Sequence, residues 1–301
     1  MQRFPIRERL PVTAPYRLDL TAQALQRLAA NVVDVIGDDG VYRRALELDG
    51  ACVVVRVAQS EPAALDIHAS GGDPARVRAA VARMLGADAD LSAWMRRAAK
   101  IPWLGRIATQ LRGVHPPRYP TMWEACAHAI VFQQISIHAA AAIMRRLVER
   151  LGTRADADGI ELIAFPQPRA ILNASDADLE GVGLSANKRA HLRGTADALL
   201  AGAVPEEEIA ALPTPLAVER LTGLRGIGPW SAAVVLLRGF GRLDIFPLKD
   251  SGVARTVRDL AGDVTVDLDA VLETLGPLRG MLYYHLLLGR LRNLSPGATD
   301  S

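Results

Sequence analysis

The chain has 301 residues, of which 50% are hydrophobic and 23% charged, and its formal net charge is +2. This composition is typical of a globular protein with two or three domains. Cys52 and Cys126 are the only cysteines, which excludes a disulfide framework and a four-cysteine zinc or iron–sulfur site within the chain. The apolar runs are too short to span a bilayer and no secretory signal is recognisable, so we expect a cytoplasmic protein without a membrane partner.

The first part of the chain, residues 1–113, predicts a mixed α/β domain. Four segments have the alternation or the β-branched content of strands: Tyr16–Thr21, Val41–Leu48, Ala51–Gln59 and Ala64–Ala69. Asp49 and Gly50 form the predicted hairpin turn between the second and third of these. Apolar residues recur at helical spacing in Ala22–Val35 and Pro74–Leu85. We therefore expect a small antiparallel sheet with helices on one face.

Strand signals stop at about Pro116, and residues 114–294 predict a helical region. Thr121 and Glu124 have the spacing of a capping box, and Ser175 with Asp178 starts a short helix that ends before a turn at Gly181–Gly183. The longer predicted helices are Ile137–Leu151 (closed by Gly152), Asn187–Leu200, Leu216–Leu224, Pro229–Leu237, Ser251–Leu260, Leu268–Leu275 and Arg279–Leu291. Residues 295–301 are expected to be a disordered tail. The predicted fold class is α+β, with the α/β domain followed by a two-lobe helical region.

A glycine-rich turn joins two of these helices within residues 216–239. Gly226 and Gly228 allow a sharp turn, and Pro229 occupies the first helical position, where its missing N–H is not needed. The helix that follows presents free N–H groups and the positive end of its dipole, which suits a phosphate of a nucleic-acid backbone. Ile227 is expected to fix the turn in the core. The alternative is a plain helix–turn–helix with glycine caps.

A single carboxylate, Asp250, follows the turn 22 positions after Gly228, at the end of a loop that contains Pro247. Such an acid beside a phosphate-binding turn suggests an enzyme that acts on a nucleotide. The alternative for Asp250 is an N-cap of the helix that starts near Ser251.

Basic residues are concentrated in two stretches. Residues 76–112 contain eight arginines and lysines against two acidic residues, and residues 221–258 contain six against two. Two locally positive stretches in a nearly neutral chain favour a surface that binds a polyanion. The alternative is that they are solvated helix faces.

The turn and the acid together resemble the helix-hairpin-helix/Gly-Pro-Asp superfamily of DNA base-excision glycosylases, and within it the DNA-3-methyladenine glycosylase II or AlkA type. The resemblance covers about Thr121 to Leu294 and includes the motifs at Phe132–Ala140 and Leu179–Ala190. It implies that the chain removes alkylated purines, of the 3-methyladenine and 7-methylguanine type, by hydrolysis of the N-glycosidic bond. The expected partner is double-stranded DNA with damaged bases, bound by a monomer associated with the nucleoid.

The resemblance also implies roles for individual residues. Asp250 corresponds to the acid that stabilises the positive charge developing on the sugar and orients water. Trp230 corresponds to a residue that lines the base pocket, where an indole stacks on a flipped base. The alternative is a core tryptophan. The late pocket tryptophan of the family is missing, and Tyr283 and Tyr284 lie one turn before its place.

Further residues are expected at the DNA surface: Gly226, Ile227, Gly228, Gln134, Ser136 and Lys249. Gln134 has the position of the side chain that fills the gap left by the flipped base, although that side chain is apolar in the AlkA type. No cofactor is required, but the carbonyl groups of Thr222, Leu224 and Gly226 match those that hold a monovalent cation, Na⁺ or K⁺, in related hairpins.

Two other functions stay open. The chain could be a non-catalytic helix-hairpin-helix protein that binds DNA structures, although such a protein needs neither a downstream acid nor an aromatic pocket. An oxidised-base glycosylase with lyase activity would carry a lysine at the position of Trp230 for Schiff-base attack, and this chain has none there. The iron–sulfur type of the superfamily is excluded by the lack of cysteines.

Overall fold

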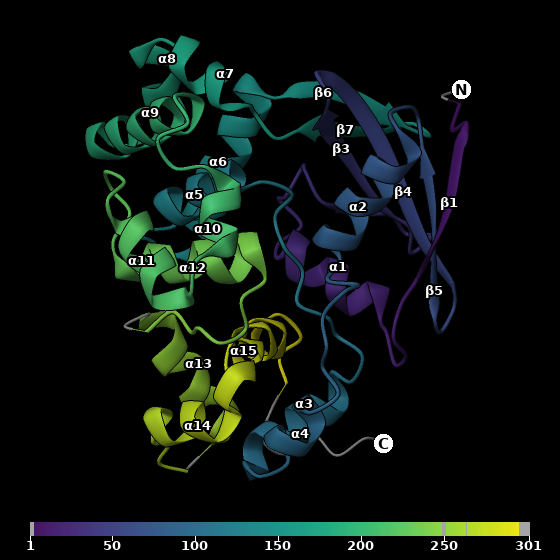
Figure 1. Cartoon of the computed structure of the whole chain (residues 1–301), viewed down its shortest axis with the longest axis vertical. Coiled ribbons are helices and arrows are strands. Elements are labelled where there is room, and N and C mark those ends of the chain that lie inside the picture. Colours follow the sequence, from purple (N-terminus) through teal and green to yellow (C-terminus); the bar gives the residue numbers. More distant parts are fainter. Residues whose placement is uncertain (1–2, 249–250, 263, 295–301) are drawn as a thin grey trace.

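A computed structural model describes residues 3–248, 251–262 and 264–294 of the chain. A twisted sheet lies on one side of the molecule and two groups of helices lie on the other (Figure 1). The predicted α+β class is therefore confirmed.

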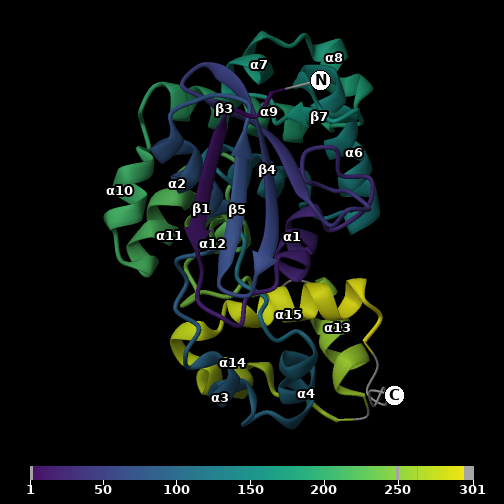
Figure 2. The same cartoon turned by 90° about the vertical axis from the view of Figure 1, so that its right-hand side faces the viewer.

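The sheet has five strands in the order β1-β5-β4-β3-β2, and every neighbouring pair is antiparallel. Figure 2 shows β1, β5 and β4 from the sheet side. The strands are β1 (Ile6–Pro11), β2 (Val35–Ile36), β3 (Tyr42–Leu48), β4 (Ala51–Glu61) and β5 (Ala64–Ala69). The predictions for β3, β4 and β5 are confirmed to within one or two residues, whereas β1 and β2 were not expected.

Two helices, α1 (Leu18–Gln26) and α2 (Pro74–Met84), cover the face of the sheet that points toward the helical lobes (Figure 1). Val53, Val55 and Val57 alternate along β4 and all point into this core. The strand predicted at Tyr16–Thr21 is wrong, because the chain enters α1 at Leu18. The helix predicted at Ala22–Val35 is too long, because α1 ends where Arg27 adopts a left-handed conformation with φ 59°.

A second hairpin, β6 (Thr153–Ala157) and β7 (Ile160–Ala164), covers the opposite face of the sheet. Its Leu162 and Ala164 pack with Ala45 and Val54, whose side chains point away from α1 and α2. The expectation that no strand follows Pro116 is therefore wrong. The two strands have only five residues each, and they are stabilised by a sheet that lies a hundred positions earlier in the chain.

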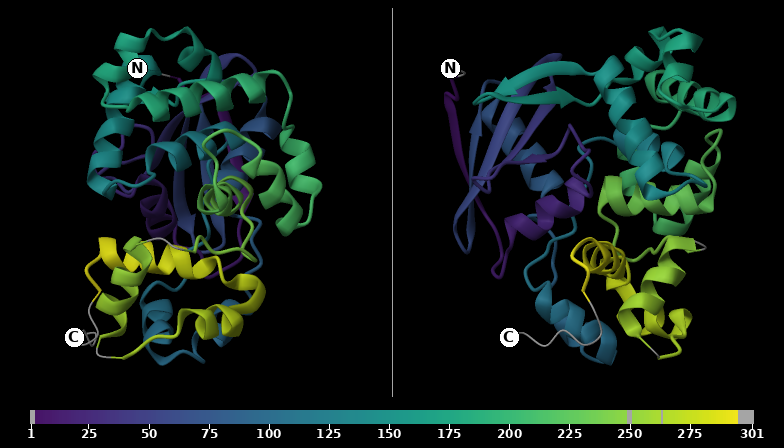
Figure 3. Two further views of the ribbon diagram at one scale, coloured as in Figure 1. Left: turned by 90° about the vertical axis from the view of Figure 1, so that its left-hand side faces the viewer. Right: turned by 180° about the vertical axis from the view of Figure 1, so that it is seen from behind.

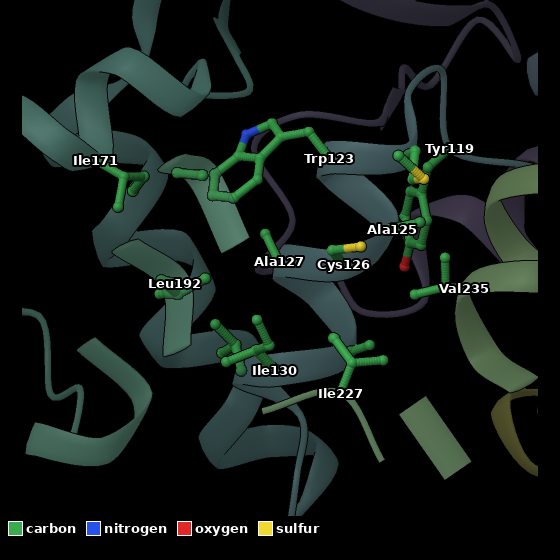
Figure 4. Close-up of a cluster of buried hydrophobic side chains, with 14 of the residues drawn as sticks. Tyr119, Trp123, Ala125, Cys126, Ala127, Ile130, Ile171, Leu192, Ile227 and Val235 are labelled. Carbon is green, nitrogen blue, oxygen red and sulfur yellow. The ribbon is translucent and has the colours of Figure 1, made fainter. Parts of the chain in front are cut away.

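The first helical lobe has its own core of aliphatic and aromatic side chains, with Ile130 and Ile227 in its centre (Figure 4). Its helices are α5 (Met122–Val131), α6 (Ile137–Leu151), α7 (Pro168–Asn173), α8 (Asp176–Gly181), α9 (Ala186–Leu200), α10 (Glu206–Ala211), α11 (Thr214–Thr222) and α12 (Pro229–Phe240). The predicted helix Ile137–Leu151 matches α6, and the Ser175–Asp178 capping box is present at α8.

The second lobe contains α3 (Trp94–Ala98), α4 (Pro102–Gln110), α13 (Ser251–Ala261), α14 (Leu268–Leu275) and α15 (Met281–Leu291). Their apolar faces share one core, and the two lobes are stacked along the long axis of the molecule (Figure 3, left). The helices α3 and α4 precede the domain boundary predicted at residue 113, yet they pack with the C-terminal helices. Leu20 and Ala24 of α1 join the same core.

A buried ion cluster connects the sheet to the first lobe. Arg44 of β3 donates to Asp34 at 2.6 Å and to both carboxylate oxygens of Glu124 in α5 at 2.6 and 2.7 Å. All three side chains are at most 3% exposed. Tyr42 also donates to Asp34. The buried Arg44 guanidinium has both carboxylate partners only when both domains are in place.

No helix of the described residues is long and apolar enough to cross a membrane.

Candidate nucleic-acid interface

The helix-hairpin-helix predicted within residues 216–239 is present as α11, a turn over 223–228, and α12. Ile227 is 3% exposed and lies in the core of the first lobe, as the sequence predicted. Gly228 is the N-cap of α12 and Pro229 its first residue. Pro229 has no N–H group. The N–H groups of the other residues in the first turn of α12 point along the helix axis, toward the exposed side of the hairpin turn.

The two glycines of this turn have different roles. Gly226 has φ +87°, and a Cβ placed on it would overlap the ring of His191. Gly228 has an ordinary φ of −88°, and a Cβ placed on it would meet nothing within 4 Å. Gly226 is therefore required by the fold, whereas the space around Gly228 is open to an approaching ligand.

A second turn lies beside the hairpin, between α5 and α6. Gln134 is exposed in a left-handed conformation with φ 56°, and the neighbouring Ile135 is 38% exposed although it is apolar. Ser136 is the N-cap of α6 and accepts from the N–H of Ala139. This turn thus offers one amide and one aliphatic side chain to the solvent.

Gln133 joins the two turns, and Lys188 of α9 fixes the backbone on either side of Phe132. The Gln133 amide donates to the carbonyl oxygen of Gly226 at 2.8 Å and to the hydroxyl oxygen of Ser231 at 2.7 Å. The Lys188 ammonium donates to the carbonyl oxygens of Val131 and Gln133 at 2.7 and 2.9 Å. Partial burial lowers the pKa of Lys188. The hairpin and the α5–α6 turn are therefore fixed relative to each other as one surface.

The predicted acid cannot be placed in this surface, because Lys249 and Asp250 lie outside the described residues. The next residue, Ser251, begins α13. The catalytic role of Asp250 and its alternative role as an N-cap both stay predictions.

The three predicted aromatic residues differ in exposure. Trp230 is partly buried against the core of the first lobe, so part of its surface stays open. Tyr283 is also partly exposed. Tyr284 is fully buried, and its hydroxyl donates to the carbonyl oxygens of Pro117 and Leu237. We therefore assign Tyr284 to the core rather than to a base pocket, since no face of its ring is available to a ligand.

A pocket that is partly open to solvent lies next to the α5–α6 turn. Phe132, which directly precedes the turn, and Ile137, which directly follows it, both line the pocket. The opposite wall comes from the end of α1 and the segment after it, with Arg27 and Asn31. Arg27 donates to the hydroxyl oxygen of Tyr283 at 3.0 Å, which connects the pocket to α15.

Sequence reasoning did not find Arg27, His128 and Phe132 as pocket residues. His128 is stacked on Tyr119, with ring centroids 4.3 Å apart. Burial, reinforced by the positive charges of Arg27, Arg238 and Arg44, holds the pKa of His128 well below its ordinary value. The helical pattern of the sequence runs through Arg27, so no local signal indicated its place in the pocket wall.

Two arginines of the second positive stretch bind inside the protein, whereas six basic residues of the first stretch are exposed: Arg76, Arg78, Arg96, Lys100, Arg106 and Arg112. Arg238 is fully buried between the rings of Tyr119 and Tyr284. Arg242 donates to the carbonyl oxygens of Ile209 and Ala210. These arginines stabilise the packing and are not part of a polyanion surface.

The fold and the glycine turn together define a two-lobe helix-hairpin-helix protein with an N-terminal sheet. The family model of the HhH-GPD superfamily of base excision DNA repair proteins matches residues 127–274. The chain belongs to this superfamily, and one of the relatives described next is named AlkA.

Two curated relatives and one solved structure illustrate the similarity. The DNA-3-methyladenine glycosylase of Bacillus subtilis is 27% identical over 173 residues, 58% of this chain and 57% of the relative. The probable bifunctional transcriptional activator/DNA repair enzyme AlkA of Mycobacterium tuberculosis is 29% identical over 259 residues, 84% of this chain and 50% of the relative. The chain thus spans about half the length of these curated relatives. The 3-methyladenine DNA-glycosylase of Archaeoglobus fulgidus superposes with a TM-score of 0.80 at 26% identity, over 96% of this chain and 99% of that one.

Proposed function

We propose that the protein is a monofunctional DNA glycosylase that flips alkylated purines out of double-stranded DNA and hydrolyses their N-glycosidic bond. The observation that carries the proposal is the joint surface of the hairpin and the α5–α6 turn, fixed by Gln133 and bordered by a pocket. Backbone N–H groups at Gly228 suit a phosphate, and the exposed side chains of the second turn suit the gap in a duplex from which a base has been removed.

The similarity to relatives named 3-methyladenine glycosylases supports this class of substrate. In the proposed reaction, the bond between the sugar C1′ and the base nitrogen breaks, and both electrons leave with the base. Asp250 stabilises the positive charge that develops on the sugar and orients a water molecule, whose oxygen adds to C1′ while one of its protons is released to solvent. Trp230 stacks on the flipped base. It stands where a lyase would need a lysine, so hydrolysis rather than Schiff-base chemistry is proposed.

The hairpin carbonyl groups are suited to a monovalent cation. The oxygen of Leu224 accepts from the N–H of Ile227, and that of Gly226 accepts from Gln133. A carbonyl oxygen has a second lone pair, so we propose that these two groups and the carbonyl of Thr222 bind Na⁺ or K⁺. Such an ion would add positive charge beside the phosphate. A melting temperature that rises in KCl or NaCl, but not in tetramethylammonium chloride at equal ionic strength, would support this site.

The first experiment is base release from duplex DNA treated with a methylating agent, with the wild type and Asp250→Asn compared by chromatography of the released bases. We expect free 3-methyladenine or 7-methylguanine from the wild type alone, while both proteins bind DNA equally. Release by the variant at the parent rate would show that Asp250 is not the catalytic acid. Tight DNA binding by the wild type without release of any base would favour the alternative, a non-catalytic protein that binds DNA structures as a monomer.

A further inference from the structure

Two adjacent glutamines in the α5–α6 turn have opposite surroundings. Gln134 is exposed, whereas Gln133 is partly buried and its amide forms hydrogen bonds within the protein. An exposed amide is available to a ligand. An amide whose hydrogens are both bound inside the protein holds its partners in place instead. Gln133 therefore acts through the groups that it holds.

The Gln133 amide is bound to the hairpin on both sides of Gly228. An amide nitrogen carries two hydrogens, and Gln133 donates one to the carbonyl oxygen of Gly226 at 2.8 Å and the other to the hydroxyl oxygen of Ser231 at 2.7 Å. Gly226 lies in the hairpin turn, and Ser231, which is 2% exposed, lies in the first turn of α12. The N-terminus of α12 cannot move relative to Gln133 without lengthening one of these bonds.

The backbone of Gln133 is fixed as well, by Lys188 of α9. The Lys188 ammonium donates to the carbonyl oxygen of Gln133 at 2.9 Å and to that of Val131 at 2.7 Å. The carbonyl group of Gln133 and the N–H group of Gln134 belong to one planar peptide unit. Lys188 thus sets the direction in which the chain enters Gln134, whose left-handed conformation has φ 56°. Gln133 is held through its backbone while its side chain holds the hairpin.

These bonds connect two turns that would contact different parts of one duplex. In the proposed function, the N-terminus of α12 binds a phosphate, and the exposed side chains of Gln134 and Ile135 enter the gap left by the flipped base. The phosphate and the base stack of one duplex have a fixed separation, so the two turns need a fixed separation too. A misplacement of about 1 Å in such an arrangement can cost about a hundredfold in rate.

We propose that Gln133 is a positioning residue that couples phosphate binding at the hairpin to removal of the damaged base from the stack. The inference rests on the proposed glycosylase function and deepens it. Gln133 keeps the α5–α6 turn in register with the hairpin and contacts neither the phosphate nor the base. Loss of its amide therefore leaves the binding of undamaged duplex intact and slows the release of a base that has to be unpaired first.

The test uses one damaged strand in two duplexes. A strand with one methylated purine, 7-methylguanine or 3-methyladenine, is annealed either to its full complement or to a complement with an abasic analogue opposite the damaged base. A base without a partner costs less to flip out. Single-turnover release is measured at saturating enzyme concentration for both duplexes. Fluorescence anisotropy gives the affinity for the undamaged duplex.

Two variants and one matched control are compared with the wild type. Gln133→Met keeps the length of the side chain and removes both donors, whereas Ser231→Ala removes one acceptor and leaves the α5–α6 turn unchanged. The control is Gln59→Met. The Gln59 amide also joins two elements, because it donates to the carbonyl oxygen of Tyr16 at 2.9 Å and accepts from the N–H of Leu18 at 2.9 Å, but it lies in the sheet domain.

We expect Gln133→Met to slow release from the fully paired duplex by about ten- to a hundredfold. Release opposite the abasic analogue should slow by less than about threefold, because that base needs no unpairing. Ser231→Ala should change the ratio of the two rates in the same direction by at least about threefold, whereas Gln59→Met should leave it within about twofold. All three variants should bind the undamaged duplex within about twofold of the wild type.

Contrary results separate the inference from the proposed function. A wild type that releases neither base from the paired duplex overturns both. If the wild type releases a base but Gln133→Met slows the two duplexes equally, or slows neither, the inference is wrong and the function stands. Weaker binding of the undamaged duplex by Gln133→Met would assign the residue to phosphate binding, which also overturns the inference. If Gln133→Met does not fold, an unchanged ratio in Ser231→Ala overturns it.

Discussion

The hairpin and the pocket lie next to each other but are constructed in different ways. The hairpin is a continuous piece of chain, α11 to α12, and it offers backbone groups to its ligand. The pocket is assembled from α1, α5, α6 and a contact to α15, and it offers side chains. A surface made of backbone suits a ligand that is the same in every sequence, such as a phosphate, whereas a surface made of side chains can distinguish one base from another.

The largest loss of stability is expected when the ion cluster that supports the pocket wall is broken. Glu124→Leu leaves Arg44 with Asp34 alone in a buried site, and the loss of one partner of a buried ion pair costs about 3–5 kcal/mol. Urea denaturation measures the change in the free energy of unfolding. The control, Glu149→Gln, breaks the more exposed pair with Arg145 and should change it by less than about 1 kcal/mol. Equal effects of the two variants would contradict the view that the pocket depends on the cluster.

The two glycines of the hairpin provide the next comparison. Gly226→Ala should destabilise the protein by about 3 kcal/mol, since the methyl group overlaps His191 and the backbone is left-handed. Gly228→Ala should change stability by less than about 0.5 kcal/mol, because its Cβ meets open space. Thermal or chemical denaturation of the pair checks this. A large loss of stability in Gly228→Ala would show that its role is structural as well.

The pH dependence of stability should separate the pocket from the hairpin. His128 is neutral in the folded protein because its pKa is well below 6.5, whereas the unfolded chain binds a proton near that value. The contribution of His128 to the free energy of unfolding is therefore fully present above pH 6.5. It falls as the pH decreases below that value, by at most about 1.4 kcal/mol per pH unit.

His128→Phe preserves the stack on Tyr119 and removes the titrating group, so its melting temperature should fall less than that of the wild type between pH 6.5 and pH 5. Parallel pH profiles of the two proteins would mean that other groups, such as the buried His285 with its pKa near 4, dominate the decrease.

The smallest effect concerns binding rather than folding. Gly228→Asp introduces a carboxylate where a phosphate is expected, and we predict about a tenfold weaker affinity for duplex DNA with a shallower dependence on salt. Gly71→Asp adds the same charge at another open glycine, in the sheet domain, and should have little effect. Fluorescence anisotropy at several salt concentrations measures both. An unchanged affinity and salt slope in Gly228→Asp would remove the hairpin from the interface.

The difference between the two regions also explains what the sequence could predict. The hairpin depends on local signals, a glycine turn and a proline at the first helical position. The sequence therefore predicted the first residue of α12 correctly. The pocket depends on contacts between residues far apart in the chain. Arg27 and Tyr283, for example, are 256 positions apart. No periodicity or motif links such residues. The sequence pattern around Arg27 is helical, but the left-handed conformation of Arg27 ends α1 in the structure.

The same limitation affected the fold. The strands β3, β4 and β5 carry strong alternation and were predicted, whereas β6 and β7 are short and depend on the distant sheet. Tyr284 was expected in the base pocket from its position alone. The sequence could not show that Tyr284 is buried, because its burial depends on how the whole second lobe packs. The helices α3 and α4 likewise gain their place from a core that α13, α14 and α15 complete.

The β6–β7 hairpin has a consequence for how the protein unfolds. It belongs to the helical part of the chain, yet its apolar side chains complete the packing of the N-terminal sheet. If the sheet melted first, Leu162 and Ala164 would be exposed to water, and Glu124 would lose its cationic partner at the same time. We therefore expect the sheet and the first lobe to form one cooperative unit, with a single calorimetric transition. A fragment that starts after the sheet would expose an apolar surface and aggregate.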